Sequence, residues 1–287
     1  RGRRPPRRGR AGSHSACRGY DIGARRPADP ERAGSVVTAT RATDSTERET
    51  VDTFATGGAA SREFIPPESA GPCNRKTWKN DQSMLLIVSG ASGVGKTTAR
   101  LHATPLLGPQ FEPVELGCFG TVPASPTVAW RQETVERIVQ RAIELDADGR
   151  HVLLAGDPIP AGEALAVPSA DSIDIAVCLL DLSEAEQNAR LDARHDPPEM
   201  RHLHLAFAEW MRRHAVDPTH VVEAVTNDSW PRMQWNRWAG ADVSERWAMS
   251  VIDGSALSPE ETGAAIAQWA HAATSGGAPV FRAGWFN

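Results

Sequence analysis

A run of apolar residues that leads into a glycine-rich turn constrains this chain more than any other feature. The run Met-Leu-Leu-Ile-Val-Ser-Gly-Ala-Ser-Gly-Val-Gly-Lys-Thr-Thr occupies residues 84–98. Gly90, Gly93 and Gly95 can adopt positive φ angles, which lets the backbone approach an anion closely. The pattern matches G-x-x-x-x-G-K-[ST], in which the turn follows a buried strand and opens a helix. The sequence therefore predicts a phosphate-binding loop at residues 90–98.

Each part of this loop has a chemical task. Backbone N–H groups of the loop and of the first helical turn point at phosphate oxygens. Lys96 supplies a mobile positive charge for the β- and γ-phosphates, and the Thr97 hydroxyl is a ligand for Mg²⁺. From residue 80 onward, Lys96 is the one lysine among fifteen basic residues, at a position that needs a compact ammonium group. The alternative is a glycine-rich turn that binds nothing. The expected nucleotide-binding residues are Gly90, Ala91, Ser92, Gly93, Val94, Gly95, Lys96, Thr97 and Thr98.

The charge of the chain is divided unevenly along its 287 residues. Residues 1–83 carry 16 Lys+Arg and 10 Asp+Glu, whereas residues 84–287 carry 15 and 26, a net charge of −11. An acidic folded region does not favour nucleic acid as a partner. Four cysteines without CxxC spacing suit a reducing compartment, and no apolar run reaches the ~20 residues of a membrane span. We therefore expect a cytoplasmic protein with no membrane partner.

The first 83 residues differ in composition from the rest. Residues 1–28 hold nine arginines and one acid, and the stretch that follows has few large apolar side chains. Such a segment buries too little apolar surface to offset the entropy lost on ordering. Three interpretations are open: a disordered tail, a basic targeting segment, or sequence translated ahead of a natural start at Met84. We favour the third interpretation, a non-native extension.

Beyond the loop, apolar strands alternate with amphipathic helices. This alternation is typical of a three-layer α/β/α sandwich around a mainly parallel, five-stranded sheet. The domain is expected to cover residues 84–274, with a flexible tail at 275–287. Strands are predicted near residues 84–89, 111–116, 151–156, 174–180 and 247–252, and helices near 97–107, 128–146, 203–215 and 260–273.

The predicted strand near 151–156 leads directly into an acid, Asp157. In a parallel sheet, ligands bind outside the carboxyl ends of the strands, so Asp157 is expected beside the phosphate-binding loop. There it would hold Mg²⁺ through water or act as a base toward a substrate hydroxyl. The alternative is an acid that merely caps the turn before Pro158.

Two arginines and a group of tryptophans stand out in the C-terminal half. Ser183 is predicted to cap a helix on which Arg190 and Arg194, four residues apart, share one face. They either act on a ligand or form a solvated face with acidic partners such as Glu186. Five tryptophans at residues 207–247 are interpreted as packing short helices onto the sheet. An aromatic wall for a base or sugar is the alternative.

Taken together, these residues resemble the P-loop small-molecule and nucleotide kinases, such as gluconate, shikimate and guanylate kinases. The resemblance covers roughly residues 84–274, and the loop at 90–98 is its most specific part. Residues 177–194 and 251–260 are similar to the late strand, the lid arginines and the closing helix of those kinases. Bacterial AAA-family and nucleoside-kinase-like ATPases are also similar.

The resemblance implies a sheet order of 2-3-1-4-5, ATP and Mg²⁺ as cofactors, and a small-molecule phosphoryl acceptor as the partner. Lys96 and the loop amides would cradle the phosphates, while Arg190 and Arg194 would close over the transferring group. Glu115 and Arg131 fall where such kinases often hold the acceptor.

The sequence also departs from this group. Gly156-Asp157 reverses the Asp-Gly order of many nucleotide kinases, and no gluconate or shikimate signature accompanies the loop. The resemblance therefore does not extend to the acceptor. An ATPase with a regulatory output is the alternative function. A GTP switch and an ABC-type ATPase are disfavoured because Asn-Lys-x-Asp and Leu-Ser-Gly-Gly-Gln are missing.

Overall fold

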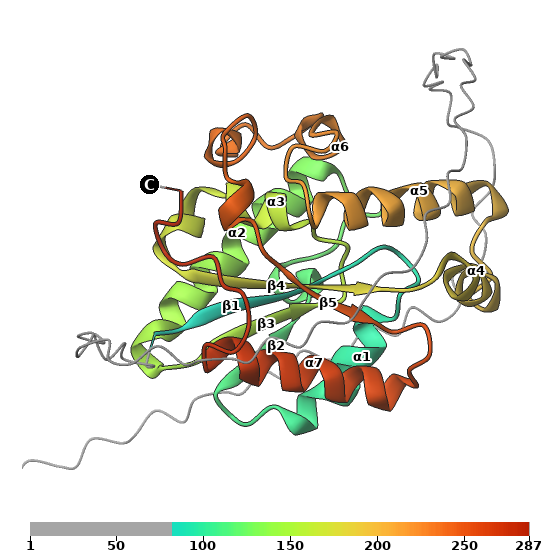
Figure 1. The fold of residues 1–287 in the computed structure, drawn as a ribbon, viewed down its shortest axis with the longest axis horizontal. Helices are drawn as coiled ribbons and strands as arrows, with labels where there is room; N and C mark the ends of the chain where they lie inside the picture. The colour runs from blue at the N-terminus through green and yellow to red at the C-terminus, as the bar shows by residue number, and fades with distance from the viewer. Residues whose placement is uncertain (1–81, 287) are drawn as a thin grey trace, which may run out of the picture. The chain divides into compact units, whose positions relative to one another are not determined.

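A five-stranded parallel sheet lies at the centre of the computed structural model, which describes residues 82–286 (Figure 1). The strand order is β2-β3-β1-β4-β5, and every pairing is parallel. The fold class and the sheet order predicted from the sequence are therefore confirmed. The strands are β1 (Met84–Ser89), β2 (Phe111–Val114), β3 (His151–Ala155), β4 (Asp174–Asp181) and β5 (Ser250–Asp253).

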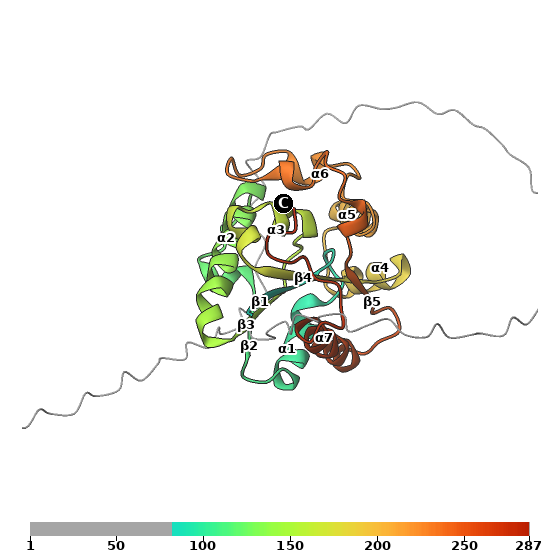
Figure 2. The same cartoon turned by 60° about the vertical axis from the view of Figure 1, so that its left-hand side comes forward.

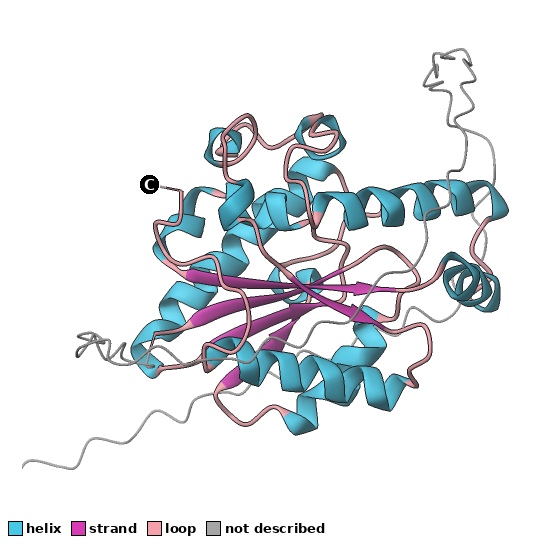
Figure 3. Ribbon diagram, in the orientation of Figure 1, coloured by secondary structure: helices cyan, strands magenta, loops and turns pink. Residues whose placement is uncertain are grey.

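Helices cover both faces of this sheet, which gives the expected three layers (Figures 2 and 3). α1 and α7 lie side by side on one face, and α2 and α3 lie on the other (Figure 2). Gly263 permits the close approach of α7 to α1, since a Cβ there would stand 2.4 Å from Cβ of His102. The α-helices are α1 (Lys96–Ala103), α2 (Val128–Glu144), α3 (Ala161–Ala166), α4 (Glu184–Ala193), α5 (Pro198–His214), α6 (Glu223–Thr226) and α7 (Pro259–Thr274).

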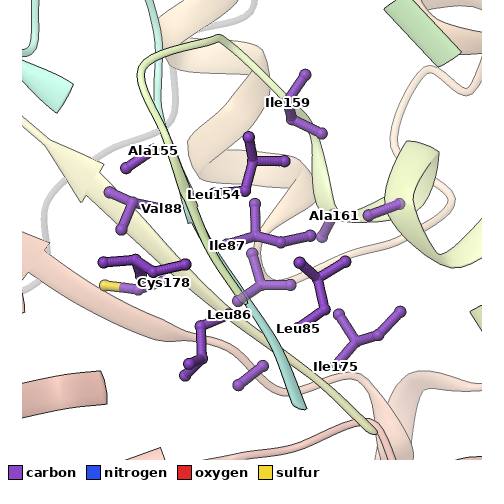
Figure 4. Close-up of a cluster of buried hydrophobic side chains, with 14 of the residues drawn as sticks. Leu85, Leu86, Ile87, Val88, Leu154, Ala155, Ile159, Ala161, Ile175 and Cys178 are labelled. Carbon is purple, nitrogen blue, oxygen red and sulfur yellow. The ribbon is translucent and has the colours of Figure 1, made fainter. Parts of the chain in front are cut away.

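The core is densest around β1. All six residues of β1 are buried, because helical layers cover both of its faces and its neighbours β3 and β4 pair with both of its edges. Figure 4 shows Leu86 and Ile87 of β1 among Leu154 of β3 and Ile175 and Cys178 of β4. This rigid centre fixes the carboxyl end of β1, where the glycine-rich turn begins.

Some element bounds differ from the predicted ones for identifiable reasons. β5 begins at Ser250 rather than 247, because Trp247 packs into the core and its indole donates to the His214 carbonyl. α5 begins at Pro198 rather than near 203, since proline is tolerated in the first turn of a helix. The short helix α3 was not predicted, because its Ala- and Gly-rich sequence shows no amphipathic period.

Residues just outside each end of the predicted domain make contacts that the sequence did not indicate. Ser83 is fully buried, and its hydroxyl donates to the Arg150 carbonyl. In the segment expected to be a flexible tail, Phe281 exchanges two backbone hydrogen bonds of 2.8 Å with Ile175. The interpretation of residues 1–83 otherwise lies outside the described residues.

The tryptophans form an aromatic cluster, which we define as Trp210, His214, Trp238 and Trp247. The His214 ring stacks on Trp210 at 4.6 Å between centroids and meets Trp238 and Trp247 edge-on at 5.4 and 5.2 Å. Each indole N–H of the cluster donates to a backbone carbonyl. The contacts agree with the packing interpretation, in which these side chains hold α5 and the following loops onto α3 and the sheet.

Candidate functional site

The glycine-rich turn has the backbone geometry that an anion-binding loop needs. Gly90, Gly93 and Gly95 have φ angles of 145°, 87° and 95°, which disfavour any residue with a side chain. A Cβ at Gly90 would stand 2.4 Å from the Leu180 carbonyl oxygen, and one at Gly93 would stand 2.9 Å from Leu191. The turn is therefore held tightly between β1, the end of β4 and α4.

The N-terminus of α1 opens onto this turn without a cap of its own. Among residues 82–286, no side chain accepts a hydrogen bond from the first turn, and the first turn contains no acidic residue. The first N–H groups of a helix have no partner within the helix, and the helix dipole places partial positive charge there. These amides are available to an external anion.

Lys96 is a buried cation at the same place. Its side chain is 4% exposed, and Nζ donates to the carbonyls of Gly90 and Ala91 at 2.8 and 2.7 Å. Burial lowers the pKa of the Lys96 ammonium from 10.5 to about 7; the charge of Asp157 opposes this shift, and that of Arg194 adds to it. Burial thus outweighs the charge of Asp157, and a negatively charged ligand close to Lys96 would favour its protonated form.

Asp157 lies two residues beyond the end of β3, and its charge acts on Lys96. Its Oδ2 accepts a hydrogen bond of 2.8 Å from the Leu116 N–H, whereas Oδ1 accepts none from the described residues. Burial raises the pKa of this carboxyl, the Leu116 hydrogen bond opposes the shift, and the charge of Glu115 adds to it. The preceding Gly156 adjoins the Thr97 hydroxyl, since a Cβ at Gly156 would lie 3.4 Å from Oγ1.

Glu115 and Arg131 both lie near Asp157, but each already has a charged partner. Glu115 accepts from Arg100 at 3.0 Å, and the charge of Glu115 acts on Asp157. Nε of Arg131 donates to Oε2 of the fully buried Glu163 at 2.8 Å, and Nη2 donates to Oε1. Asp157 also acts on the charge of Arg131. The structure therefore gathers Lys96, Asp157, Glu115 and Arg131 at one edge of the sheet.

Helix α4 joins the glycine-rich turn to the end of β5 through side chains on one face. Gln187 donates to the Ser92 carbonyl at 2.9 Å. Arg190 donates to the carbonyls of Val94 and Gly254 at 3.1 and 3.4 Å, and Glu186 accepts from its Nε at 2.8 Å. The salt bridge expected in the alternative interpretation of Arg190 is therefore present, and all three guanidinium nitrogens have partners.

Arg194 is placed differently from Arg190. It is half exposed, forms an ion pair with Asp196, and donates to the Ser92 hydroxyl at 3.1 Å. Its charge also lowers the pKa of Lys96. Arg194 thus contacts the glycine-rich turn through Ser92 while it is paired with Asp196.

Three participants in this site were missed in the sequence. Arg100 and Glu163 neutralise Glu115 and Arg131, and Gln187 fixes the loop. Arg100 and Gln187 lie on helical faces that carry predicted site residues, since Thr97 and Arg100, and Gln187 and Arg190, are three residues apart. Glu163 gave no comparable signal because α3 was not predicted.

The described residues contain neither a cluster of metal ligands nor a membrane-crossing helix. Within residues 82–286, no three His, Cys, Asp or Glu side chains form a group that would hold a metal ion. None of the described helices has the length and hydropathy of a membrane-crossing segment.

Comparison with known proteins gives distant similarities. No protein-family model matches the chain, and no curated protein matches it. An unliganded sugar kinase from Janibacter sp. HTCC2649 aligns with a TM-score of 0.42 at 14% identity, over 68% of this chain and 96% of that chain. A chain of the Pnkp1/Rnl/Hen1 RNA repair complex aligns with a TM-score of 0.32 at 20% identity, over 46% of each chain. At such distances the site rests on the geometry of this chain alone.

Proposed function

We propose that this protein binds ATP at the phosphate-binding loop and transfers the γ-phosphoryl group to a small acceptor. The observation that carries the proposal is the buried Lys96 beside the uncapped N-terminus of α1. A buried ammonium and the uncapped amides of α1 form a group of donors with the chemistry that binds an anion. A triphosphate matches this group of donors.

Within this proposal, Lys96 moves from the carbonyls of Gly90 and Ala91 to the β- and γ-phosphates. Thr97 and Asp157 would hold Mg²⁺, Asp157 through water, and the ion would supply positive charge to the phosphates. A nucleotide-bound Mg²⁺ keeps several waters and takes few protein ligands, so one hydroxyl and one carboxylate fit this role. Arg194 exchanges Asp196 for a phosphate oxygen.

Arg190 contributes in a different way. Because its guanidinium is bonded to Val94, Gly254 and Glu186, it positions the loop for the transfer. A loop that is held in its binding geometry before the nucleotide arrives loses less entropy on binding. The acceptor occupies the surface near Glu115, Arg131 and Asp157, where Asp157 Oδ1 accepts the proton of the attacking hydroxyl.

Turnover with a panel of acceptors tests the proposal. The purified chain is incubated with ATP, Mg²⁺ and small metabolites, and ADP release is measured together with formation of a phosphorylated product. Stimulation of both by one compound supports a kinase. Slow ADP release that no compound stimulates indicates the alternative, a regulatory ATPase. ATP turnover or binding that persists unchanged in Lys96→Ala would contradict the loop assignment itself.

A further inference from the structure

We infer that the acceptor carries no phosphate group of its own and is a neutral compound with several hydroxyl groups. The inference rests on the proposed function and concerns one surface beside the phosphate-binding loop. This acceptor surface is defined by Arg100, Glu115, Arg131, Asp157 and Glu163. Its charges decide which ligands it can accept.

Both arginines of the acceptor surface are already neutralised. Arg100 is buried, and its Nη2 lies 3.0 Å from Glu115. Arg131 forms a two-point ion pair with Glu163, which has no exposed surface. A phosphate that took the place of either carboxylate would have to separate a largely buried pair and leave that carboxylate without its partner. The charge of each arginine is therefore largely compensated before any ligand binds.

The remaining charge of the surface is negative. Asp157 adds a third carboxylate to the two that pair with the arginines, so carboxylates outnumber guanidinium groups on this surface by three to two. Lys96 does not compensate for this charge, because the nucleotide phosphates engage it. A phosphorylated acceptor would bring a dianion toward Asp157 and toward the triphosphate at once. Repulsion between neighbouring like charges disfavours binding in a partly buried site.

A hydroxyl compound, in contrast, matches the groups that the surface offers. A hydroxyl both donates and accepts hydrogen bonds. Asp157 Oδ1 accepts no hydrogen bond from the described residues, and Nη1 of Arg131 is not used in the pair with Glu163. In the reaction, the hydroxyl oxygen bonds to the γ-phosphorus as the bond to the β,γ-bridging oxygen breaks. ADP leaves with that electron pair, and the hydroxyl proton passes to Asp157.

Arg232 lies in a segment that contacts α2 beside Arg131. The Arg232 guanidinium lies 5.2 Å from the centre of the Trp230 ring, and the Trp230 N–H donates to Gln132, which follows Arg131 in α2. Arg232 is exposed, so water screens its interaction with any ligand. An exposed cation can steer an anion, but it does not replace a buried one.

Matched pairs of acceptors test the inference by turnover. ADP formation is measured with glycerol and glycerol 3-phosphate, glucose and glucose 6-phosphate, and adenosine and adenosine monophosphate, together with further pairs of the same kind. Stimulation by an unphosphorylated member and none by its phosphate ester supports the inference. Stimulation by any phosphorylated member at equal or higher kcat/KM overturns it.

A binding measurement decides the question if no pair is turned over. With the loop saturated by Mg²⁺ and a non-hydrolysable ATP analogue, inorganic phosphate is titrated in a calorimeter. The wild type should show no saturable phosphate site, whereas Glu163→Gln and Glu115→Gln, which free Arg131 and Arg100, should each gain one. A saturable site in the wild type, or none in either folded variant, overturns the inference.

The proposed function fails separately, at an earlier step. If the ATP analogue does not bind, the loop assignment is wrong, and phosphate is titrated into Lys96→Ala instead. This titration measures phosphate binding at the acceptor surface without a contribution from Lys96. No saturable site supports the inference, and a saturable site overturns it.

Discussion

Lys96 and His214 are both buried basic side chains, and burial lowers the pKa of each, but their surroundings differ. Lys96 meets two backbone carbonyls and faces the uncapped amides of α1. His214 is enclosed by the indoles of the aromatic cluster, and its Nε2 accepts a hydrogen bond of 3.1 Å from the Gly162 N–H. Its pKa falls from 6.5 to about 4 through burial, with Asp217 opposing and His220 adding to the shift.

The difference separates a binding group from a packing group. A neutral imidazole is what the aromatic cluster needs, since the ring accepts a hydrogen bond and packs among apolar faces. A neutral Lys96 serves no such purpose, because an amine buried among amides and carbonyls gains most when an anion restores its charge. The lowered pKa alone does not distinguish the two residues; the donors and acceptors that surround Lys96 point to anion binding there.

Removal of Lys96 is expected to have the largest effect. Lys96→Ala should weaken ATP binding by about 100-fold or more, because charge-assisted hydrogen bonds to phosphate are lost from a buried site. The fold should survive, since the variant removes a buried charge and leaves the sheet intact. Calorimetric titration with ATP and Mg²⁺ measures the affinity.

The matched control for Lys96→Ala is Arg213→Ala. Arg213 lies on α5 and is 62% exposed, and it pairs with Glu209. ATP affinity should not change in this variant. Equal losses in both variants would mean that overall charge, and not the loop, sets the affinity.

The aromatic cluster should control stability at low pH. The pKa of His214 is lower in the folded chain than in the unfolded chain, so the folded state binds fewer protons between pH 6.5 and 4. The free energy of unfolding should therefore fall as the pH drops through this window, by up to about 3 kcal/mol. Urea titrations at a series of pH values measure the effect.

His214→Gln isolates this contribution. Glutamine keeps an oxygen that can accept from Gly162, but it does not titrate, so the pH dependence should weaken between pH 6.5 and 4. ATP affinity at pH 7 should stay at the wild-type value, because the cluster lies outside the phosphate-binding loop. An unchanged pH dependence in the variant would assign the acid sensitivity to other groups.

The sequence predicted the loop better than the cluster, for a physical reason. The bend from Gly90 to Lys96 depends on residues that are adjacent in the chain, so a local pattern specifies it. The partners of His214 come from residues 162, 210, 238 and 247, which only tertiary packing brings together. The same limit applies within the candidate site. Asp157 was found because a strand end marks it, whereas the Arg131–Glu163 pair depends on how α2 packs against α3.

Arg190 in α4 and Arg194 at the C-cap of that helix give a third, smaller effect. Arg190→Met should weaken ATP binding about tenfold and also lower the Tm of the free protein, because charged hydrogen bonds to two carbonyls are lost. Arg194→Met should leave the Tm of the free protein nearly unchanged, since exposed ion pairs contribute little. Thermal unfolding with and without nucleotide distinguishes the two roles. Equal loss of Tm in both variants would contradict the separation.

The smallest effect sharpens the contrast between the two buried basic groups. Lys96 has a pKa of about 7 in the free protein, and bound phosphate should raise it, so ATP binding takes up a proton above pH 7. Affinity should then fall by up to about tenfold per pH unit as the pH rises above 7. The charge of Arg194 lowers the pKa of Lys96, so Arg194→Ala should move the onset of this fall in affinity to higher pH. The charge of Asp157 raises the pKa of Lys96, so Asp157→Asn should move the onset to lower pH. Titrations in two buffers of different ionisation enthalpy measure the proton uptake, and an onset that neither variant moves would show that Lys96 is not the titrating group.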